Sequence, residues 1–259
     1  MLCQRHVQVV LALCLLLVLW QCLRAPTDGL SPFPWAPSLL VSPAARCTAS
    51  ANSSTWFNTR YDMAVGPLLT GTAHELSSDV VQWWLTLQGP RNGIQLQAII
   101  QQLFSVLPAP TGSVRDPSRC RTCAVVGNSG RLTGSGHGLR IDAHDWVLST
   151  YARVKQFIKA DRNKVLILSP AFLKYIHENW TQRRGRYPST GFTALLFALH
   201  ACQQVSVFGF GADSEGNWHH YWEKNRWSGA FRRTRVHDAD VEFSLIERLA
   251  AEGRISFYK

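Results

Sequence analysis

The sequence predicts an α/β fold in which a mainly parallel sheet is flanked by helices. Along residues 75–258, short hydrophobic runs typical of buried strands alternate with longer amphipathic segments typical of helices. Such alternation implies parallel strands that are covered on both faces. Hydrophobic residues make up 46% and charged residues 17% of the 259 residues, which excludes intrinsic disorder for most of the chain.

The expected elements alternate after two initial helices. In the second of these, Leu96, Ile99 and Leu103 share one face at three- and four-residue spacing. Hydrophobic runs rich in Val, Ile, Leu and Phe predict strands over residues 124–126, 145–148, 164–168, 205–208 and 255–258. Helical patterns cover residues 75–88, 94–107, 171–180, 190–202 and 239–251.

The charge balance favours anionic ligands. Lys and Arg number 27 against 17 Asp and Glu, a formal charge of +10, which suits nucleotides, phosphates or acidic sugars. The basic residues are scattered, with short pairs such as Arg183 and Arg184, whereas a nucleic-acid surface needs a basic stripe. The sequence therefore disfavours nucleic acid as a partner.

The N-terminus predicts a membrane anchor. Residues 7–23 are apolar apart from Gln8 and Gln21, and this length is adequate for a short bilayer span. A cleaved signal peptide is the alternative, although Arg24 and Pro26 fit poorly around its cleavage site. We expect a cytoplasmic tail (1–6), an anchor (7–23), a proline-rich stem (24–45) and one luminal domain (46–259).

The cysteines and glycosylation sequons agree with a luminal domain. Four cysteines of the body, Cys47, Cys120, Cys123 and Cys202, permit two disulfides. Cys120 and Cys123 form a C-x-x-C, which elsewhere is a redox pair or half of a zinc site, but an oxidising compartment favours long-range disulfides. Sequons begin at Asn52 and Asn179.

Two loops carry features of ligand-binding sites. After the strand at 124–126, residues 127–130 (GNSG) open a glycine-rich run, which is either a loop that cradles a phosphate or ribose, or a flexible turn. Residues 187–191 (YPSTG) precede a hydrophobic helix, and Ser189 or Thr190 is either an ordinary N-cap or part of a site for an anionic group.

Histidines, carboxylates and aromatic residues are densest in residues 218–223 (WHHYWE) and 237–242 (HDADVE). Histidine titrates near neutral pH, so it can take a proton from a sugar hydroxyl or hydrogen-bond a leaving phosphate. Asp238 and Asp240 form a D-x-D, which is either a metal clamp or the acidic start of a helix.

These segments together resemble a known family. Residues 120–130 (CRTCAVVGNSG), 186–191 (RYPSTG), 209–213 (GFGAD) with 219–223 (HHYWE), and 237–242 (HDADVE) resemble the long, short, third and very-short motifs of animal sialyltransferases. The resemblance covers about residues 47–259. The HHYWE form is most similar to α2,3-sialyltransferases that act on Gal-β1,3-GalNAc of O-glycans and glycolipids.

The resemblance implies an activity and a setting. Sialic acid would pass from CMP-sialic acid to the 3-hydroxyl of a terminal galactose, with inversion and without a metal or other cofactor. The fold would be Rossmann-like, a variant of glycosyltransferase type A. The protein would be a single-pass type II Golgi membrane protein that forms homo-oligomers or assembles with other Golgi enzymes.

The resemblance also implies residue roles. His237 would be the general base, and His220 with Tyr151 would hydrogen-bond the departing CMP phosphate. Tyr187 would face the acceptor galactose. The disulfides would be Cys123–Cys202 and Cys47–Cys120. The remaining donor-binding residues would be Asn128, Ser129, Ser189, Thr190, Gly191, Gly209, Trp218 and His219.

The sequence departs from the family pattern after Leu148. Relatives continue there with an Arg-Met-Asn segment, which includes a donor-contacting Asn, and several dozen further residues, whereas Ser149 and Thr150 lead directly into Tyr151. An internal segment is thus missing, and Arg131 stands where relatives commonly have a second CMP-contacting Asn. The alternative to an active enzyme is therefore a shortened, inactive variant that binds or oligomerises with intact Golgi enzymes.

Overall fold

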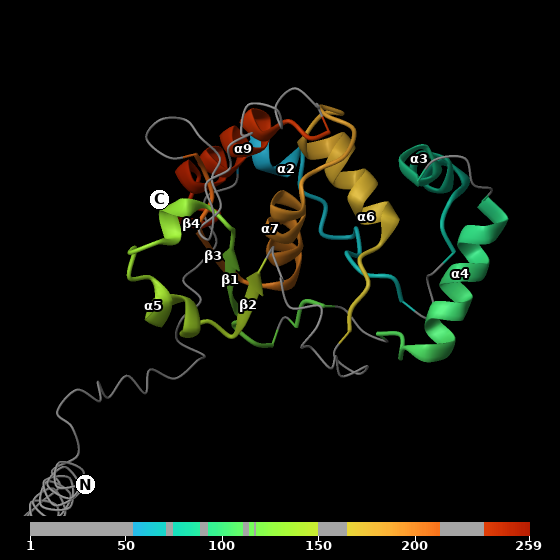
Figure 1. Ribbon diagram of the computed structural model, residues 1–259, viewed down its shortest axis with the longest axis horizontal. Coiled ribbons are helices and arrows are strands. Elements are labelled where there is room, and N and C mark those ends of the chain that lie inside the picture. The colour runs from blue at the N-terminus through green and yellow to red at the C-terminus, as the bar shows by residue number, and fades with distance from the viewer. Residues whose placement is uncertain are drawn as a thin grey trace, which may run out of the picture. The chain divides into compact units, whose positions relative to one another are not determined.

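The structure, a computed structural model, describes residues 54–70, 75–88, 93–110, 114–116, 118–149, 165–212 and 236–259. All of them belong to one compact unit, residues 42–259. Within these described ranges, four parallel strands form one sheet in the order β2-β1-β3-β4 (Figure 1). The strands are β1 (Thr122–Val126), β2 (Trp146–Ser149), β3 (Gln204–Phe208) and β4 (Ser256–Tyr258). The prediction of a parallel α/β fold is confirmed.

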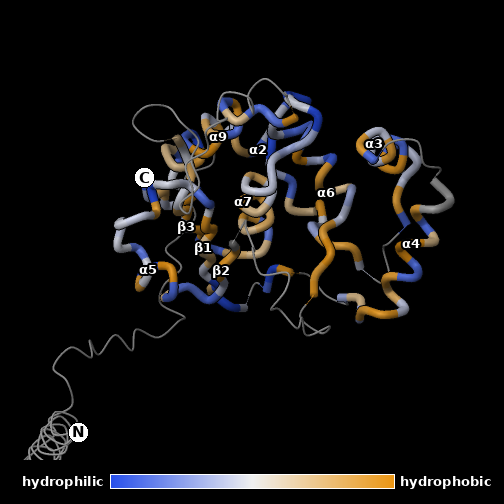
Figure 2. The backbone as a smooth tube through the Cα atoms, viewed as in Figure 1, coloured by the Kyte–Doolittle hydropathy of each residue, from blue (hydrophilic) through white to orange (hydrophobic). Residues whose placement is uncertain are grey.

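The two central strands, β1 and β3, are the most deeply buried. Their register pairs Cys123 with Val205 and Val125 with Val207, and all four side chains belong to the main hydrophobic core. Each of these strands has a neighbouring strand on both sides, and Figure 2 traces the hydropathy of the chain. β1 is buried along nearly its whole length, whereas partly buried and buried residues alternate at the start of β3. Phe208, on the opposite face, stacks on Tyr258 with ring centroids 4.6 Å apart.

Helix α7 (Thr190–Ala201) forms the centre of the core. Nine of its twelve residues are buried, because the helix packs on β1, β2 and β3 and other elements cover the rest of its surface. A helix that is apolar nearly all round is stable only in such an interior position. The predicted helix over residues 190–202 is confirmed.

The remaining helices surround this centre. α9 (Ala239–Ala251) contacts β4 and buries Leu245, Ile246 and Leu249. α6 (Pro170–Tyr175) starts at the N-cap Ser169 and continues as a π-helical turn, η4 (Ile176–Trp180). The others are α2 (Thr55–Asn58), α3 (Ser78–Gln88), α4 (Gly93–Val106), the 3-10 turn η2 (Gly130–Leu132) and α5 (Gly138–Asp142).

One predicted strand is wrong. We expected residues 164–168 to join the sheet, but the described part, 165–168, pairs instead with residues 67–69. Leu69 donates its backbone N–H to the Ile167 carbonyl at 2.9 Å, and Leu68 and Leu168 form an isolated antiparallel bridge. The hydrophobic run therefore finds its partner in a segment about 100 residues earlier in the chain.

The predicted N-terminal anchor lies outside the described residues. Within the part of the chain that the structure describes, no helix is both long and apolar enough to cross a bilayer.

Candidate active site

The loops that follow β1 and β3 lie against each other at the carboxyl ends of these adjacent strands. The backbone N–H of Gly127 donates to the Phe208 carbonyl at 2.8 Å. A Cβ on Gly127 would lie 2.3 Å from the Gly209 carbonyl oxygen, so only glycine allows this approach. Ligands of open α/β sheets bind outside the carboxyl ends of the strands, which makes this edge the candidate site.

Ser129 fixes the glycine-rich loop. Its backbone N–H donates to the Gly209 carbonyl at 3.0 Å, and its buried hydroxyl donates to the Gly211 carbonyl at 2.8 Å. The same hydroxyl oxygen caps η2 by accepting the Arg131 N–H. The loop is therefore held in one conformation and is not a flexible turn. Asn128 lies half-buried between these anchored residues.

Arg131 connects the two loops at the surface. Its Nε donates to the Ala212 carbonyl at 2.5 Å, and its side chain is exposed. Leu132, next to it, packs so closely on Gly209 that a Cβ there would lie 2.6 Å from the Leu132 Cγ. The residue that departs from the family pattern thus brings a positive charge to the join between the loops.

A second pair of segments brings Tyr187 to His237. The backbone N–H groups of Arg186 and Tyr187 both donate to the Val236 carbonyl, at 2.8 and 3.3 Å. Gly185 has a φ of +71°, and a Cβ on it would lie 2.7 Å from the His237 Cα. The rings of Tyr187 and His237 are 6.3 Å apart between centroids. Tyr187 is 39% exposed, so its ring is accessible beside the histidine.

His237 has the environment of a base. It is half-buried, and this desolvation lowers its pKa below the usual 6.5. Burial disfavours the charged imidazolium, so the neutral ring, which can accept a proton, persists to lower pH. A neutral imidazole beside an exposed aromatic ring is suited to proton abstraction from a bound hydroxyl.

Ser189 and Glu242 link the start of α7 to the first turn of α9. The Ser189 hydroxyl caps α7 by accepting the Phe192 N–H at 3.1 Å, and the Ser189 N–H donates to Glu242 Oε1 at 2.7 Å. Glu242 is only 6% exposed. Desolvation raises its pKa from 4.5 to about 7, against the opposing effect of hydrogen bonds from the Ser189 hydroxyl and N–H. The N-cap interpretation of Ser189 is therefore confirmed.

The D-x-D segment begins α9. Asp238 Oδ1 accepts the Val241 N–H at 3.1 Å, so Asp238 is the N-cap and Asp240 lies in the first turn. This is the helix-start interpretation of the acidic pair. In addition, a Cβ on Gly211 would lie 3.0 Å from the Phe243 ring, so α9 contacts the loop after β3. The long, short, third and very-short motif segments are thereby connected through direct contacts.

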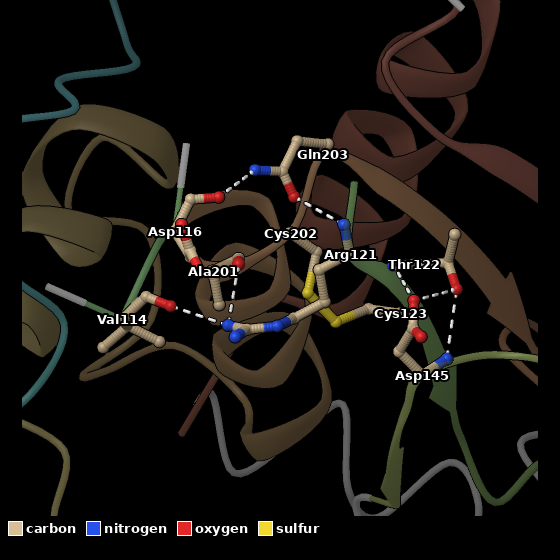
Figure 3. The surroundings of a disulfide bond; sticks show 9 residues. All are labelled: Val114, Asp116, Arg121, Thr122, Cys123, Asp145, Ala201, Cys202 and Gln203. Carbon is tan, nitrogen blue, oxygen red and sulfur yellow. Dashed lines mark hydrogen bonds between the residues drawn. A yellow bond between two sulfur atoms is a disulfide. The ribbon is translucent and has the colours of Figure 1, made fainter. Parts of the chain in front are cut away.

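A disulfide lies at the other end of β1 (Figure 3). Cys123, near the start of β1, is bonded to Cys202, the C-cap of α7, and the pair is separated by 79 residues. Arg121 donates to the Val114 carbonyl at 2.7 Å, and Asp145 accepts two hydrogen bonds from Thr122. The implied Cys123–Cys202 bridge is present, and it fixes α7 against β1 at the end remote from the site. Cys120 is also disulfide-bonded.

Several predicted site residues lie outside the described part of the chain: Tyr151, Trp218, His219, His220, Cys47 and Asn52. Asn179 is described, and its side chain is exposed on η4. The roles implied for Asn128, Ser129, Ser189, Thr190, Gly191, Gly209, Tyr187 and His237 stay predictions, although these residues flank the two contacts described above.

Glu242 is the residue that the motif analysis did not single out. A signal was present in the sequence: Leu245, Ile246 and Leu249 follow it at three-, four- and seven-residue spacing, which places a carboxylate on the buried stripe of α9. Carboxylates are almost never fully buried without a partner, so this position calls for one.

The chain belongs to glycosyltransferase family 29, the sialyltransferases. The family model matches residues 68–150 and 146–254. The chain is 38% identical to the rat protein CMP-N-acetylneuraminate-beta-galactosamide-alpha-2,3-sialyltransferase 2, over 83% of this chain and 79% of the relative. Identity to the human protein CMP-N-acetylneuraminate-beta-galactosamide-alpha-2,3-sialyltransferase 1 is 36%, over 82% of this chain and 81% of the relative.

Solved structures agree. A crystal structure of a mammalian sialyltransferase superposes with a TM-score of 0.71 at 33% identity, over 83% of this chain and 98% of that chain. A second mammalian sialyltransferase structure, in complex with Gal-beta-1-3GalNAc-ortho-nitrophenol, has a TM-score of 0.66 at the same identity and coverage.

The matches also bear on the internal segment. The two family-model stretches meet at residues 146–150, which include β2. The alignment with the rat relative is 276 positions long although it includes only 83% of this 259-residue chain. Positions of the relative therefore have no counterpart here, in agreement with a segment missing after Leu148.

Proposed function

We propose that this chain transfers sialic acid from CMP-sialic acid to the 3-hydroxyl of a terminal galactose in Gal-β1,3-GalNAc. The observation that supports this best is the half-buried His237, whose ring lies 6.3 Å from that of Tyr187 and whose segment is hydrogen-bonded to the start of α7. The relatives named above are α2,3-sialyltransferases, and one structural neighbour holds a Gal-beta-1-3GalNAc compound.

The proposed step is a single inverting displacement. His237 takes the proton of the galactose 3-hydroxyl, and the oxygen attacks the anomeric carbon of sialic acid. The bond from that carbon to the CMP phosphate oxygen breaks, and the phosphate leaves with the electron pair. The lowered pKa of His237 keeps the base neutral, which this step requires. His220 and Tyr151 are proposed to hydrogen-bond the phosphate.

The donor is proposed to bind across the loops at the ends of β1 and β3 and at the start of α7. The backbone N–H groups of Thr190 and Gly191 lie in the first turn of α7. The positive end of the helix dipole is located there and favours an anion. Gly209, with a φ of +68°, keeps the backbone close to Asn128 and Ser129. Trp218 and His219 are proposed to complete the donor site, and Tyr187 to contact the acceptor galactose.

The setting is proposed from the sequence. We expect a single-pass type II Golgi protein with residues 46–259 luminal, glycosylated at Asn179 or Asn52 and acting on glycoproteins or glycolipids without a metal. We also expect a Rossmann-like, glycosyltransferase-A-variant fold, a Cys47–Cys120 disulfide, and homo-oligomers or association with other Golgi enzymes. The exposed position of Asn179 is compatible with a glycan there.

The interrupted family match supports a second candidate function. A chain that lacks a segment after β2 lacks whatever donor contacts that segment supplies, and it would then act only as a binding or oligomerisation partner of intact Golgi enzymes. The missing positions adjoin β2, which lies at the edge of the described sheet next to β1, the strand that leads to the glycine-rich loop.

The deciding experiment uses the full-length chain in detergent micelles. Transfer of labelled sialic acid from CMP-sialic acid to a Gal-β1,3-GalNAc acceptor is measured beside His237→Ala, and CMP binding is measured by calorimetry for both. Transfer that is lost in His237→Ala, with CMP binding retained, supports the enzyme. CMP binding without transfer in the wild-type chain favours the second candidate, and absence of both refutes the proposed donor site.

A further inference from the structure

We propose that Glu242 is a positioning residue of this site: its buried carboxylate holds Ser189 and so fixes the first turn of α7 against the segment that carries His237. The function of that turn as part of the donor site rests on the proposed function. The positioning itself rests only on contacts among described residues.

The carboxyl group of Glu242 is fixed by a hydrogen bond and by burial. Oε1 accepts the Ser189 N–H at 2.7 Å. The side chain is 6% exposed, so water cannot replace this partner unless the contact between the start of α7 and α9 opens. Val236 lies six residues before Glu242 in the chain, and its carbonyl oxygen accepts the N–H groups of Arg186 and Tyr187. The loop before α7 is therefore held at both of its ends.

This arrangement commits Ser189. Its hydroxyl oxygen accepts the Phe192 N–H at 3.1 Å as the N-cap of α7. Its backbone N–H is also occupied, because it donates to Glu242 Oε1 at 2.7 Å. The groups that remain at this turn for a nucleotide are the exposed Thr190 hydroxyl and the Thr190 and Gly191 N–H groups. Ser189 thus shapes the turn, and its neighbours contact the ligand.

The ionised form of Glu242 is the stronger acceptor for the Ser189 N–H. Burial opposes ionisation, and the negative charge of Asp238 opposes it further. Burial lowers the pKa of His237, in the preceding segment. The other charged or titratable groups of the described segments 185–189 and 236–242 are Arg186, Tyr187 and Asp240. The strength of the Ser189 contact should therefore vary with pH near neutrality.

The first test is amide hydrogen exchange in the full-length chain in detergent, read on the peptide that covers residues 187–193. Glu242→Ala should speed exchange of this peptide by about tenfold to a hundredfold, since a hydrogen bond to a charged group is lost. Glu242→Gln, which keeps an acceptor oxygen, should restore most of the protection. The matched control is Glu247→Ala, on the exposed face of the same helix, which should leave the peptide unchanged.

Exchange in Glu242→Ala that equals Glu247→Ala would overturn the proposal. If Glu242→Ala loses protection from exchange throughout the chain, the variant is unfolded, and exchange of residues 187–193 in Glu242→Gln becomes the deciding measurement. In the wild type, protection corrected for intrinsic rates should rise as pH falls from 8 to 6, because opening the turn exposes a carboxyl group whose pKa is about 7 when buried, and in Glu242→Gln it should not change. A pH series in His237→Gln that keeps this rise assigns it to Glu242. Equal pH dependence in the wild type and Glu242→Gln also contradicts the proposal.

The second test separates this role from the proposed function. Glu242→Ala should raise the KM for CMP-sialic acid about tenfold while the KM for the acceptor stays within about twofold, because only the donor turn is loosened. Glu242→Gln, which keeps an acceptor for the Ser189 N–H, should hold the KM for CMP-sialic acid near its wild-type value. A wild-type chain that neither binds CMP nor transfers sialic acid refutes the proposed function, and the exchange experiment still decides the role of Glu242. A KM for CMP-sialic acid in Glu242→Ala that equals the wild-type value in an active chain refutes the coupling.

Discussion

Gly185 lies directly against His237, so closely that a Cβ on Gly185 would be 2.7 Å from the His237 Cα. Gly134 has nearly the same backbone conformation, φ +74° against +71°, but nothing lies within 4 Å of its hypothetical Cβ. Substitution of Gly134 therefore measures the free-energy cost of the backbone conformation alone, whereas substitution of Gly185 adds the cost of the contact with His237.

Gly185→Ala should destabilise the chain by more than Gly134→Ala and should also reduce transfer. Both substitutions force alanine into a left-handed conformation, at a cost of about 1 kcal/mol. Gly185→Ala must in addition displace the backbone at His237, which moves the proposed base. Urea unfolding and transfer rates of the two variants are the measurement, and equal losses in both would contradict a close approach to His237.

His237→Gln should abolish transfer and leave CMP binding unchanged. In the wild type, the activity of the base falls as pH decreases through the pKa of His237, which burial places below 6.5. The acidic limb of the pH–rate profile should therefore lie below pH 6.5. His144→Gln, on the α5 side of the sheet, is the matched control and should keep both transfer and the profile.

Cys202→Ser should lower the free energy of unfolding by about 2–5 kcal/mol, because the Cys123–Cys202 bridge closes a loop of 79 residues. The measurement is the urea midpoint of the oxidised variant against the wild type. Mass mapping of free thiols provides the check on the bridge itself: detection of Cys123 and Cys202 as free thiols in the folded wild-type chain would exclude it.

The pKa of Glu242 predicts a stability that decreases as pH rises. The folded-state pKa of about 7 exceeds 4.5, so the folded chain binds more protons than the unfolded chain between these values. The contribution of this group is fully present below pH 4.5 and is lost as pH rises to about 7, by an amount on the order of 3 kcal/mol.

Glu242→Gln should remove this slope, while Glu247→Gln should keep it. The measurement is the free energy of unfolding from urea titrations at pH 5, 6, 7 and 8. A slope in Glu242→Gln equal to that of the wild type would mean that another group titrates in this range.

The centre of the sheet could be predicted from the sequence because β1 is buried along nearly its whole length, and β3 contributes the buried residues Val205, Val207 and Phe208. The segment 165–168 has the same composition but pairs with residues 67–69, and a local pattern does not identify a partner so distant in the chain. Hydrophobicity predicted that this segment is paired, and only tertiary structure shows with which segment.

The candidate site was predictable as a set of segments but not as a set of contacts. Motif residues such as Ser189 and His237 could be named individually. The approach of Gly127 to Gly209 and the hydrogen bond between Ser189 and Glu242 depend on how loops from different strands and helices meet. The spacing of α9 places Glu242 on its apolar stripe, but that pattern does not identify Ser189 as its partner.

Among the described residues, strand β2 occupies one edge of the four-stranded sheet, and the family match is interrupted at its end. Material added or removed at that point changes the width of the sheet from one side only. The β1–β3 pair, the Cys123–Cys202 bridge and the contact between α7 and α9 are all assembled inward of that edge. The length of the chain can therefore differ between relatives at this edge of the sheet, while the contacts that form the candidate site lie in the interior of the fold.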